Sequence, residues 1–139
     1  LLILPSVSLS TAEVYSRYRR ASVRPGPSAA ELLKLARCGA DVLGGRLYNM
    51  LEPAAFAICP ELAGLHEAIR QMGVPHVRMT GSGSAMFALF DQYQRAQSWQ
   101  QRIRHELDVA TRVVRSLADG HASGGQNNGN HRGQGQTGR

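Results

Sequence analysis

Apolar positions open the chain as a short continuous run and then change to helical spacing. Residues 1–7 form a run that is typical of a buried strand. Residues 10–13 and 28–31 each fit the S-x-x-E pattern, in which Ser and Glu satisfy free backbone amides at a helix start. We therefore expect one helix over residues 10–20 and a second that begins at the other motif and ends near Gly39.

Proline and glycine divide the middle of the chain. Residues 47–58 predict a helix that Pro53 bends or splits into two pieces. Pro60 suits the first turn of the next helix, which Gly73 ends. The apolar residues of that helix recur at helical spacing: Leu62, Leu65, Ile69 and Met72.

The last third of the chain predicts two strands around a tight turn, followed by a helix and a strand. The strands are residues 75–79 and 85–90, and the second is apolar throughout, as a central strand would be. A helix over residues 92–106 and a strand over 109–117 follow. This order predicts an α+β fold, in which one antiparallel sheet has helices packed on one face, related to split βαβ (ferredoxin-like) folds.

Composition limits the domain organisation and the compartment. With 42% hydrophobic and 19% charged residues, positions 1–118 are enough for one domain with its own core. Residues 119–139 are rich in Gly, Asn and Gln, and we expect a disordered tail there. No apolar run is long enough to predict a membrane span. Two cysteines are too few for a disulfide framework, so we expect Cys38 and Cys59 to be reduced and half-buried, which suits the cytoplasm.

Charge and histidines add little chemistry of their own. The formal net charge is +6, but the arginines are scattered from Arg17 to Arg139, which argues against a nucleic-acid partner. A basic balance also suits a protein that handles phosphorylated substrates, or only a solvated surface. His66 and His105 are expected to be solvated, and nothing pairs any histidine with a nucleophile or a ligand set. We predict no metal site.

The turn between the two strands carries the clearest chemical signal. It consists of Thr80, Gly81, Ser82, Gly83 and Ser84. Glycines allow positive φ, and successive amides in such a turn make a concavity that binds anions. On spacing alone an ordinary hairpin turn explains it as well. It matches neither the P-loop nor the dinucleotide fingerprint.

The motifs together resemble a known family more specifically than any one of them does. Residues 47–54, residues 60–62, and the turn 80–84 followed by residues 87–90 resemble the C-terminal half of the 4-diphosphocytidyl-2-C-methyl-D-erythritol kinases, within the GHMP kinase superfamily. Residues 5–15 resemble the strand-to-helix entry of the same family. The resemblance covers about residues 1–117 and implies the GHMP-kinase C-terminal domain fold.

The resemblance implies a function and assigns residues to it. The family uses ATP with Mg²⁺ to phosphorylate the 2-hydroxyl of a cytidine-diphosphate-linked methylerythritol in non-mevalonate isoprenoid biosynthesis. Its phosphate-loop motif falls on residues 80–84, and its cytidine pocket on Thr11 and Tyr15, which share a helix face at i and i+4. The catalytic Lys and Asp and the main ATP loop lie in the family's N-terminal half, so we expect that half upstream. We assign no catalytic residue here and predict no kinase activity for this chain alone.

This sequence departs from the family pattern at several positions, and two other readings stay open. Met50 stands where the segment that includes Asn49 and Glu52 usually has an acidic residue, and Ser6 and Ser8 stand where glycines are common. One alternative is another GHMP kinase, of the homoserine or mevalonate type. The other is a basic α+β module that binds a small ligand or RNA.

Overall fold

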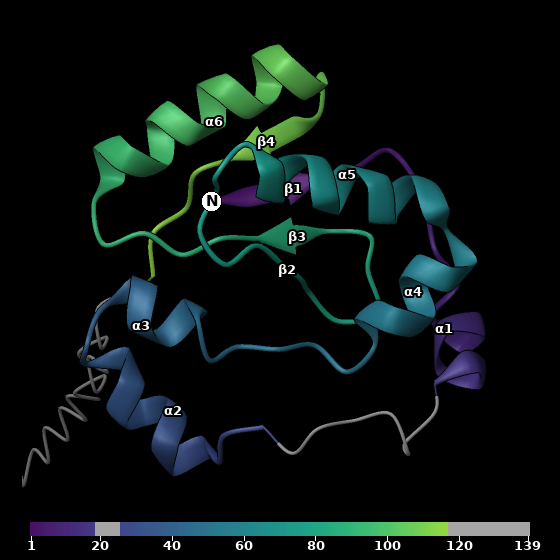
Figure 1. Ribbon diagram of the computed structural model, residues 1–139, viewed down its shortest axis with the longest axis horizontal. Coiled ribbons are helices and arrows are strands. Elements are labelled where there is room, and N and C mark those ends of the chain that lie inside the picture. The colour runs from purple at the N-terminus through teal and green to yellow at the C-terminus, as the bar shows by residue number, and fades with distance from the viewer. Residues whose placement is uncertain (19–25, 117–139) are drawn as a thin grey trace, which may run out of the picture.

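A four-stranded antiparallel sheet forms the centre of the molecule (Figure 1). The computed structural model describes residues 1–18 and 26–116, so the end of the first predicted helix, the end of the last predicted strand and the predicted tail lie outside the described residues. The strand order is β2-β3-β1-β4, and every pair is antiparallel. The strands are β1 (Leu2–Leu4), β2 (Arg78–Met79), β3 (Met86–Phe87) and β4 (Ala110–Arg112).

The antiparallel α+β arrangement and the interior position of the strand within residues 85–90 are confirmed. Each strand is shorter than predicted. Pro5 has no amide hydrogen to donate to a ladder, which is the physical reason why β1 ends at Leu4. Beyond β3, Ala88 still donates its amide hydrogen to the Leu1 carbonyl oxygen at 3.0 Å, so the ladder extends past the strand itself.

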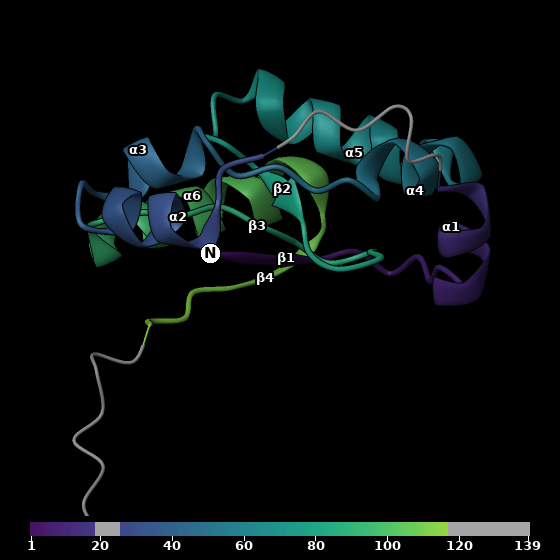
Figure 2. The ribbon, with the colours of Figure 1, turned by 90° about the horizontal axis from the view of Figure 1, so that it is seen from below.

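One face of the sheet is buried and the other is open. Because side chains alternate along a strand, Ile3, Met79 and Met86 point to the same face, and all three are buried. They pack with buried residues of the helices α5 (Pro60–Gln71) and α6 (Tyr93–Leu107): Leu62, Ile69 and Ile103. Figure 2 shows α5 on one side of the sheet, and no described helix beneath β1 and β4 on the other. The prediction of helices on one face is therefore confirmed.

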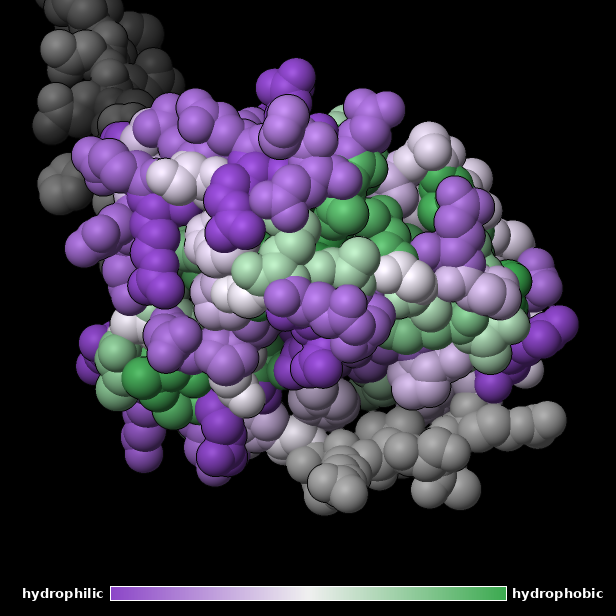
Figure 3. Space-filling model, turned by 45° about the horizontal axis from the view of Figure 1, so that its top comes forward, coloured by the Kyte–Doolittle hydropathy of each residue, from purple (hydrophilic) through white to green (hydrophobic). Residues whose placement is uncertain are grey.

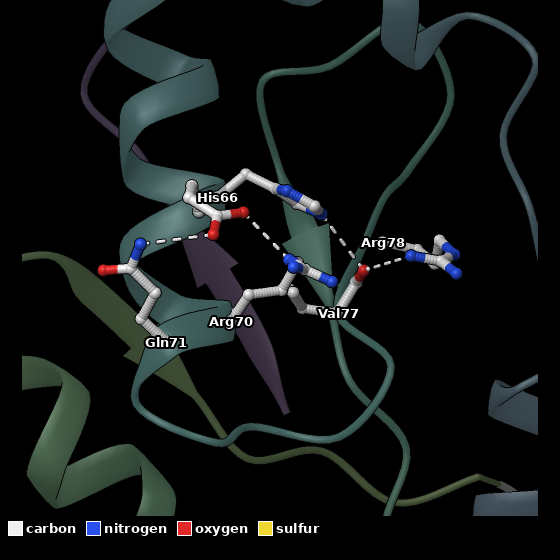
Figure 4. Close-up of polar contacts among 6 residues, drawn as sticks. His66, Arg70, Gln71, Val77 and Arg78 are labelled. Atoms are coloured by element: carbon white, nitrogen blue, oxygen red, sulfur yellow. Dashed lines mark hydrogen bonds and ion pairs between the residues drawn. The ribbon is translucent and has the colours of Figure 1, made fainter.

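A histidine fastens α5 to the edge strand. His66 Nε2 lies 3.2 Å from the Val77 carbonyl oxygen, which also accepts from Arg78 Nη1 at 3.0 Å (Figure 4). The His66 ring also stacks at a tilt against Phe56, 5.1 Å between centroids. The expectation of a solvated His66 was wrong, because α5 turns this residue inward toward β2. His105 is exposed on α6, as predicted.

Two helices begin at the predicted capping motifs. Helix α1 spans Thr11–Arg17, and the Ser10 side chain accepts from the Glu13 amide. Helix α2 spans Ala29–Ala36 and has the complete reciprocal capping box between Ser28 and Glu31. No residue of α2 is buried, so its start is fixed by local sequence rather than by packing.

The region between residues 39 and 58 differs from the prediction. A short helix, α3 (Ala40–Gly44), was not predicted, and it begins where the Asp91 carboxylate accepts from the Ala40 amide at 2.7 Å. Helix α4 spans Glu52–Ile58, five residues later than expected. Pro53 therefore lies in the first helical turn, where its missing amide costs nothing, and neither bends nor splits the helix.

The surface is mostly hydrophilic, with separate apolar areas exposed among the charged side chains (Figure 3). Cys59 is half-buried as predicted, whereas the prediction of a half-buried Cys38 was wrong, because Cys38 lies in an exposed turn after α2. Within residues 1–18 and 26–116, no helix is long and apolar enough to cross a membrane.

Candidate functional site

The Gly/Ser turn joins β2 to β3 and depends on its two glycines. Gly81 and Gly83 have φ values of +56° and +89°, in the region that favours glycine. A Cβ on Gly83 would lie 2.7 Å from the Met79 Sδ and 3.0 Å from a Leu9 methyl carbon, so these side chains would have to shift to admit one. Met79 and Leu9 thus form the floor against which the turn is packed.

Several backbone amides of the turn remain available to a ligand. The Thr80 amide donates to the Ala85 carbonyl at 2.9 Å and the Gly83 amide to the Thr80 carbonyl at 3.1 Å. In the described part of the chain, the amides of Gly81, Ser82 and Ser84 have no acceptor. Thr80 and Gly81 are exposed and the next three residues are half-buried, so the turn lies at the surface. Unpaired amides at an exposed turn are suited to an anion.

The two groups of predicted site residues meet in space. Thr11 Oγ1 and Ser82 Oγ lie 2.9 Å apart, although 71 positions separate them in the chain. Figures 1 and 2 both show the β2–β3 turn beside α1. Tyr15, one helical turn further along α1, is 59% exposed and within the described residues shares no hydrogen bond with the turn. The Ser84 hydroxyl donates to the Val7 carbonyl, so this hydroxyl is already used within the fold.

Two polar residues to which the sequence assigned no role contact the turn or the residue just before it. Asn49 Nδ2 donates to the Met79 and Gly81 carbonyl oxygens, each at 2.8 Å. Glu52 Oε1 accepts from the Met79 amide at 2.8 Å. In the sequence, the only signal for these contacts is the N-x-x-E spacing of Asn49 and Glu52 at the start of α4. Met50, between them, is 43% exposed, and the contacts of both neighbours form with Met at this position.

A concavity of about 770 Å³ borders the turn on the open side of the sheet. Its lining is mainly apolar, and Thr80 is the member of the turn that reaches it. Other lining residues come from β1, β3, the segments after β3 and β4, and the start of α6: Leu2, Phe87, Phe90, Val114 and Tyr93. A ligand that contacts the turn through an anionic group could therefore extend over an apolar surface.

Two further groups of charged side chains lie outside this site. His76 Nε2 pairs with Asp41 Oδ1 at 3.3 Å beside α3. Hydrogen bonds from Arg70 and Gln71 lower the pKa of Glu67 on the outer side of α5 (Figure 4). Among the described residues, no three His, Cys, Asp or Glu side chains gather as a metal site would require.

Known proteins match most of the chain but only part of their own length. The 4-diphosphocytidyl-2-C-methyl-D-erythritol kinase of Shouchella clausii is 29% identical over 118 residues, and that of Leptospira interrogans is 32% identical over 120 residues. These matches cover 84% and 81% of this chain and 40% of each relative. The chain thus spans about 40% of the length of these curated relatives.

A solved structure and a family description agree with these relatives. A crystal structure of 4-(cytidine 5'-diphospho)-2C-methyl-D-erythritol kinase matches with a TM-score of 0.60 and 30% identity, over 75% of this chain and 38% of that one. The family described as GHMP kinases C terminal matches residues 25–109, which include the turn and the segment that contacts it. By this match and by its fold, the chain belongs to the GHMP kinase C-terminal family.

Proposed function

We propose that the chain is the C-terminal part of a kinase that transfers a phosphoryl group from ATP to the 2-hydroxyl of 4-diphosphocytidyl-2-C-methyl-D-erythritol. The observation that carries the proposal is the 2.9 Å contact between Thr11 and Ser82. It joins a residue expected to bind the cytidine end of the substrate to a residue of the turn expected to bind phosphate.

In this proposal the chain binds and orients, and it does not supply the chemistry. Free amides of the turn hold phosphoryl oxygens, and the Tyr15 ring offers an exposed face on which cytosine can stack. ATP with Mg²⁺ supplies the transferred group and neutralises its charge. The described residues offer no cluster of carboxylates for Mg²⁺, so the proposal assigns no metal ligand and no catalytic residue to this chain. The free cysteines are consistent with a cytoplasmic location, which is part of the proposal.

Titration of the purified chain with cytidine diphosphate tests the binding part of the proposal. We expect saturable binding, with NMR shifts confined to α1 and the turn. Replacement of the aromatic ring in Tyr15→Ala should weaken the affinity about tenfold, because a base stacked on an aromatic ring contributes about 1–3 kcal/mol. Tyr48→Ala is a matched control, since Tyr48 is also exposed but lines a different concavity, with Gly26 and Pro27.

Competition with nucleic acid distinguishes the kinase hypothesis from the alternative of a basic α+β module that binds RNA. Excess RNA should leave the binding of cytidine diphosphate unchanged. Displacement by RNA with a steep dependence on salt would instead support a nucleic-acid module. Loss of binding in Tyr48→Ala but not in Tyr15→Ala would overturn the assignment of the cytidine pocket.

A turnover assay tests the assignment of catalysis to other residues. With ATP, Mg²⁺ and 4-diphosphocytidyl-2-C-methyl-D-erythritol, the 139-residue chain is expected to release no ADP above background. In this proposal the chain provides positioning, and the Lys and Asp expected to act on the transferred phosphoryl belong to the family's N-terminal half. Measurable turnover by the chain alone would show that a catalytic residue lies within it.

A further inference from the structure

We propose that Asn49 and Glu52 are positioning residues that fix the Gly/Ser turn in the shape that binds phosphoryl oxygens. The inference rests on the proposed function, because it assumes that the turn is the phosphate site. Neither residue needs to touch the ligand. Each acts through the backbone of Met79, the last residue of β2.

The geometry of the edge strand explains why such residues are needed. Among the strands that the structure describes, β2 lies at the edge of the sheet and pairs with β3 alone. The Thr80 amide bonds to Ala85 across the ladder, so by the alternation of antiparallel pairs the amide and carbonyl of Met79 point away from β3. Without partners these two groups would stay unpaired beside a buried side chain. The Glu52 carboxylate accepts from the Met79 amide, and the Asn49 side chain donates to the Met79 carbonyl.

The constraint reaches the turn by two routes, one through Met79 and one directly from Asn49. The Met79 side chain is 1% exposed and lies directly under Gly83, where an added Cβ would come within 2.7 Å of the sulfur. Asn49 also holds the Gly81 carbonyl, so one amide group bridges the end of the strand and the first glycine of the turn. The free amides of the turn therefore keep a fixed orientation before any anion arrives.

The segment that carries the two residues is itself fastened along the same edge. Arg78 Nε donates to the Leu47 carbonyl at 2.8 Å. The Leu51 amide donates to Asn49 Oδ1 at 2.9 Å, which fixes the orientation of the Asn49 side-chain amide. Residues 47–52 thus cover β2 through specific bonds at three points along it, although they form no strand or helix before Glu52.

Binding of inorganic pyrophosphate by the purified chain and by its variants tests the inference. Asn49→Ala should weaken pyrophosphate binding about tenfold, because the bonds that hold the Met79 and Gly81 carbonyls and the bond from the Leu51 amide are all lost. It should also speed hydrogen exchange at the Thr80 and Gly83 amides by a similar factor. Glu52→Ala should act in the same direction, whereas Glu52→Gln should retain most of the affinity because its amide oxygen still accepts from Met79.

The matched control is Gln100→Ala, which removes a similar bond from a side chain to the Thr111 carbonyl at 3.0 Å on the other edge of the sheet. It should change neither pyrophosphate binding nor exchange in the turn. Equal affinity in wild type and Asn49→Ala, or equal loss in the Gln and Ala variants at position 52, would overturn the inference.

The same experiment separates this inference from the proposed function. If the unmodified chain binds no pyrophosphate, the phosphate role of the turn fails. Exchange at Thr80 and Gly83 then still decides whether Asn49 and Glu52 fix the turn. Hydrogen exchange at the α5 amides is expected to be the same in every variant. That result would show that a loss of binding does not come from unfolding.

Discussion

The Gly/Ser turn and helix α2 are both short surface segments, but they are stabilised in opposite ways. The turn is held by side chains from distant positions, including Thr11, Asn49 and Glu52. Helix α2 buries no residue, and its start is closed by its own Ser28 and Glu31. A segment fixed by the rest of the fold can keep free amides in a defined geometry, whereas a segment fixed locally is replaceable without effect on the site.

Truncation of a buried side chain under the turn should have the largest effect. Met79→Ala is expected to lower the free energy of unfolding by about 2–5 kcal/mol, through lost burial and a cavity beneath Gly83. Leu33→Ala on α2, where the side chain is 70% exposed, should change it by no more than about 0.5 kcal/mol. Urea unfolding followed by circular dichroism measures both. Similar losses of unfolding free energy in the two variants would show that the turn and α2 are not stabilised in different ways.

The same contrast explains which parts of the fold the sequence could predict. The start of α2 needs only residues three apart, so the S-x-x-E pattern is sufficient. Helix α3 begins at an amide that bonds to Asp91, which is 51 positions away and invisible to any local pattern. Pro53 was placed in the middle of a helix because apolar residues precede it, although Leu47 and the residues after it lie along β2 instead.

The candidate site was predictable to a similar extent. The glycines at 81 and 83 and the hydroxyl residues around them indicated an anion-binding turn, and family resemblance added Thr11 and Tyr15. Whether Thr11 meets Ser82 depends on tertiary structure, and only the coordinates give that distance. The contacts of Asn49 depend on β2 being an edge strand, which requires the strand order as well as the sequence.

Removal of the helix cap should have a smaller and strictly local effect. Ser28→Ala is expected to destabilise α2 by about 1 kcal/mol, because a free amide at the helix start loses its acceptor. Exchange of the α2 amides should then speed up about fivefold, while the Thr80 and Gly83 amides stay unchanged. Hydrogen exchange followed by NMR measures both segments in one sample. Faster exchange in the turn would show that α2 and the turn are coupled.

Acid should produce the smallest effect, again confined to α2. The bond from the Ser28 amide to Glu31, at 2.7 Å, and the bond from the Ser28 side chain lower the pKa of the Glu31 carboxyl below its ordinary value. Since the pKa is lower in the folded state, Glu31 stabilises α2 at neutral pH, and this contribution is lost as the pH falls through the lowered pKa. NMR titration of the Glu31 side chain should therefore give a midpoint below that of glutamate in an unstructured peptide.

The cause of this shift can be divided between two groups. Ser28→Ala removes the hydroxyl but keeps the backbone amide, which is the larger cause, so the midpoint of Glu31 should rise only part of the way. Glu67 serves as the internal control, because its pKa is lowered by Arg70 and Gln71 on α5 and should not move in this variant. A complete return of the Glu31 midpoint to the peptide value would mean that the backbone bond forms only when the hydroxyl is present. The two halves of the capping box would then be cooperative, and α2 would open as a unit.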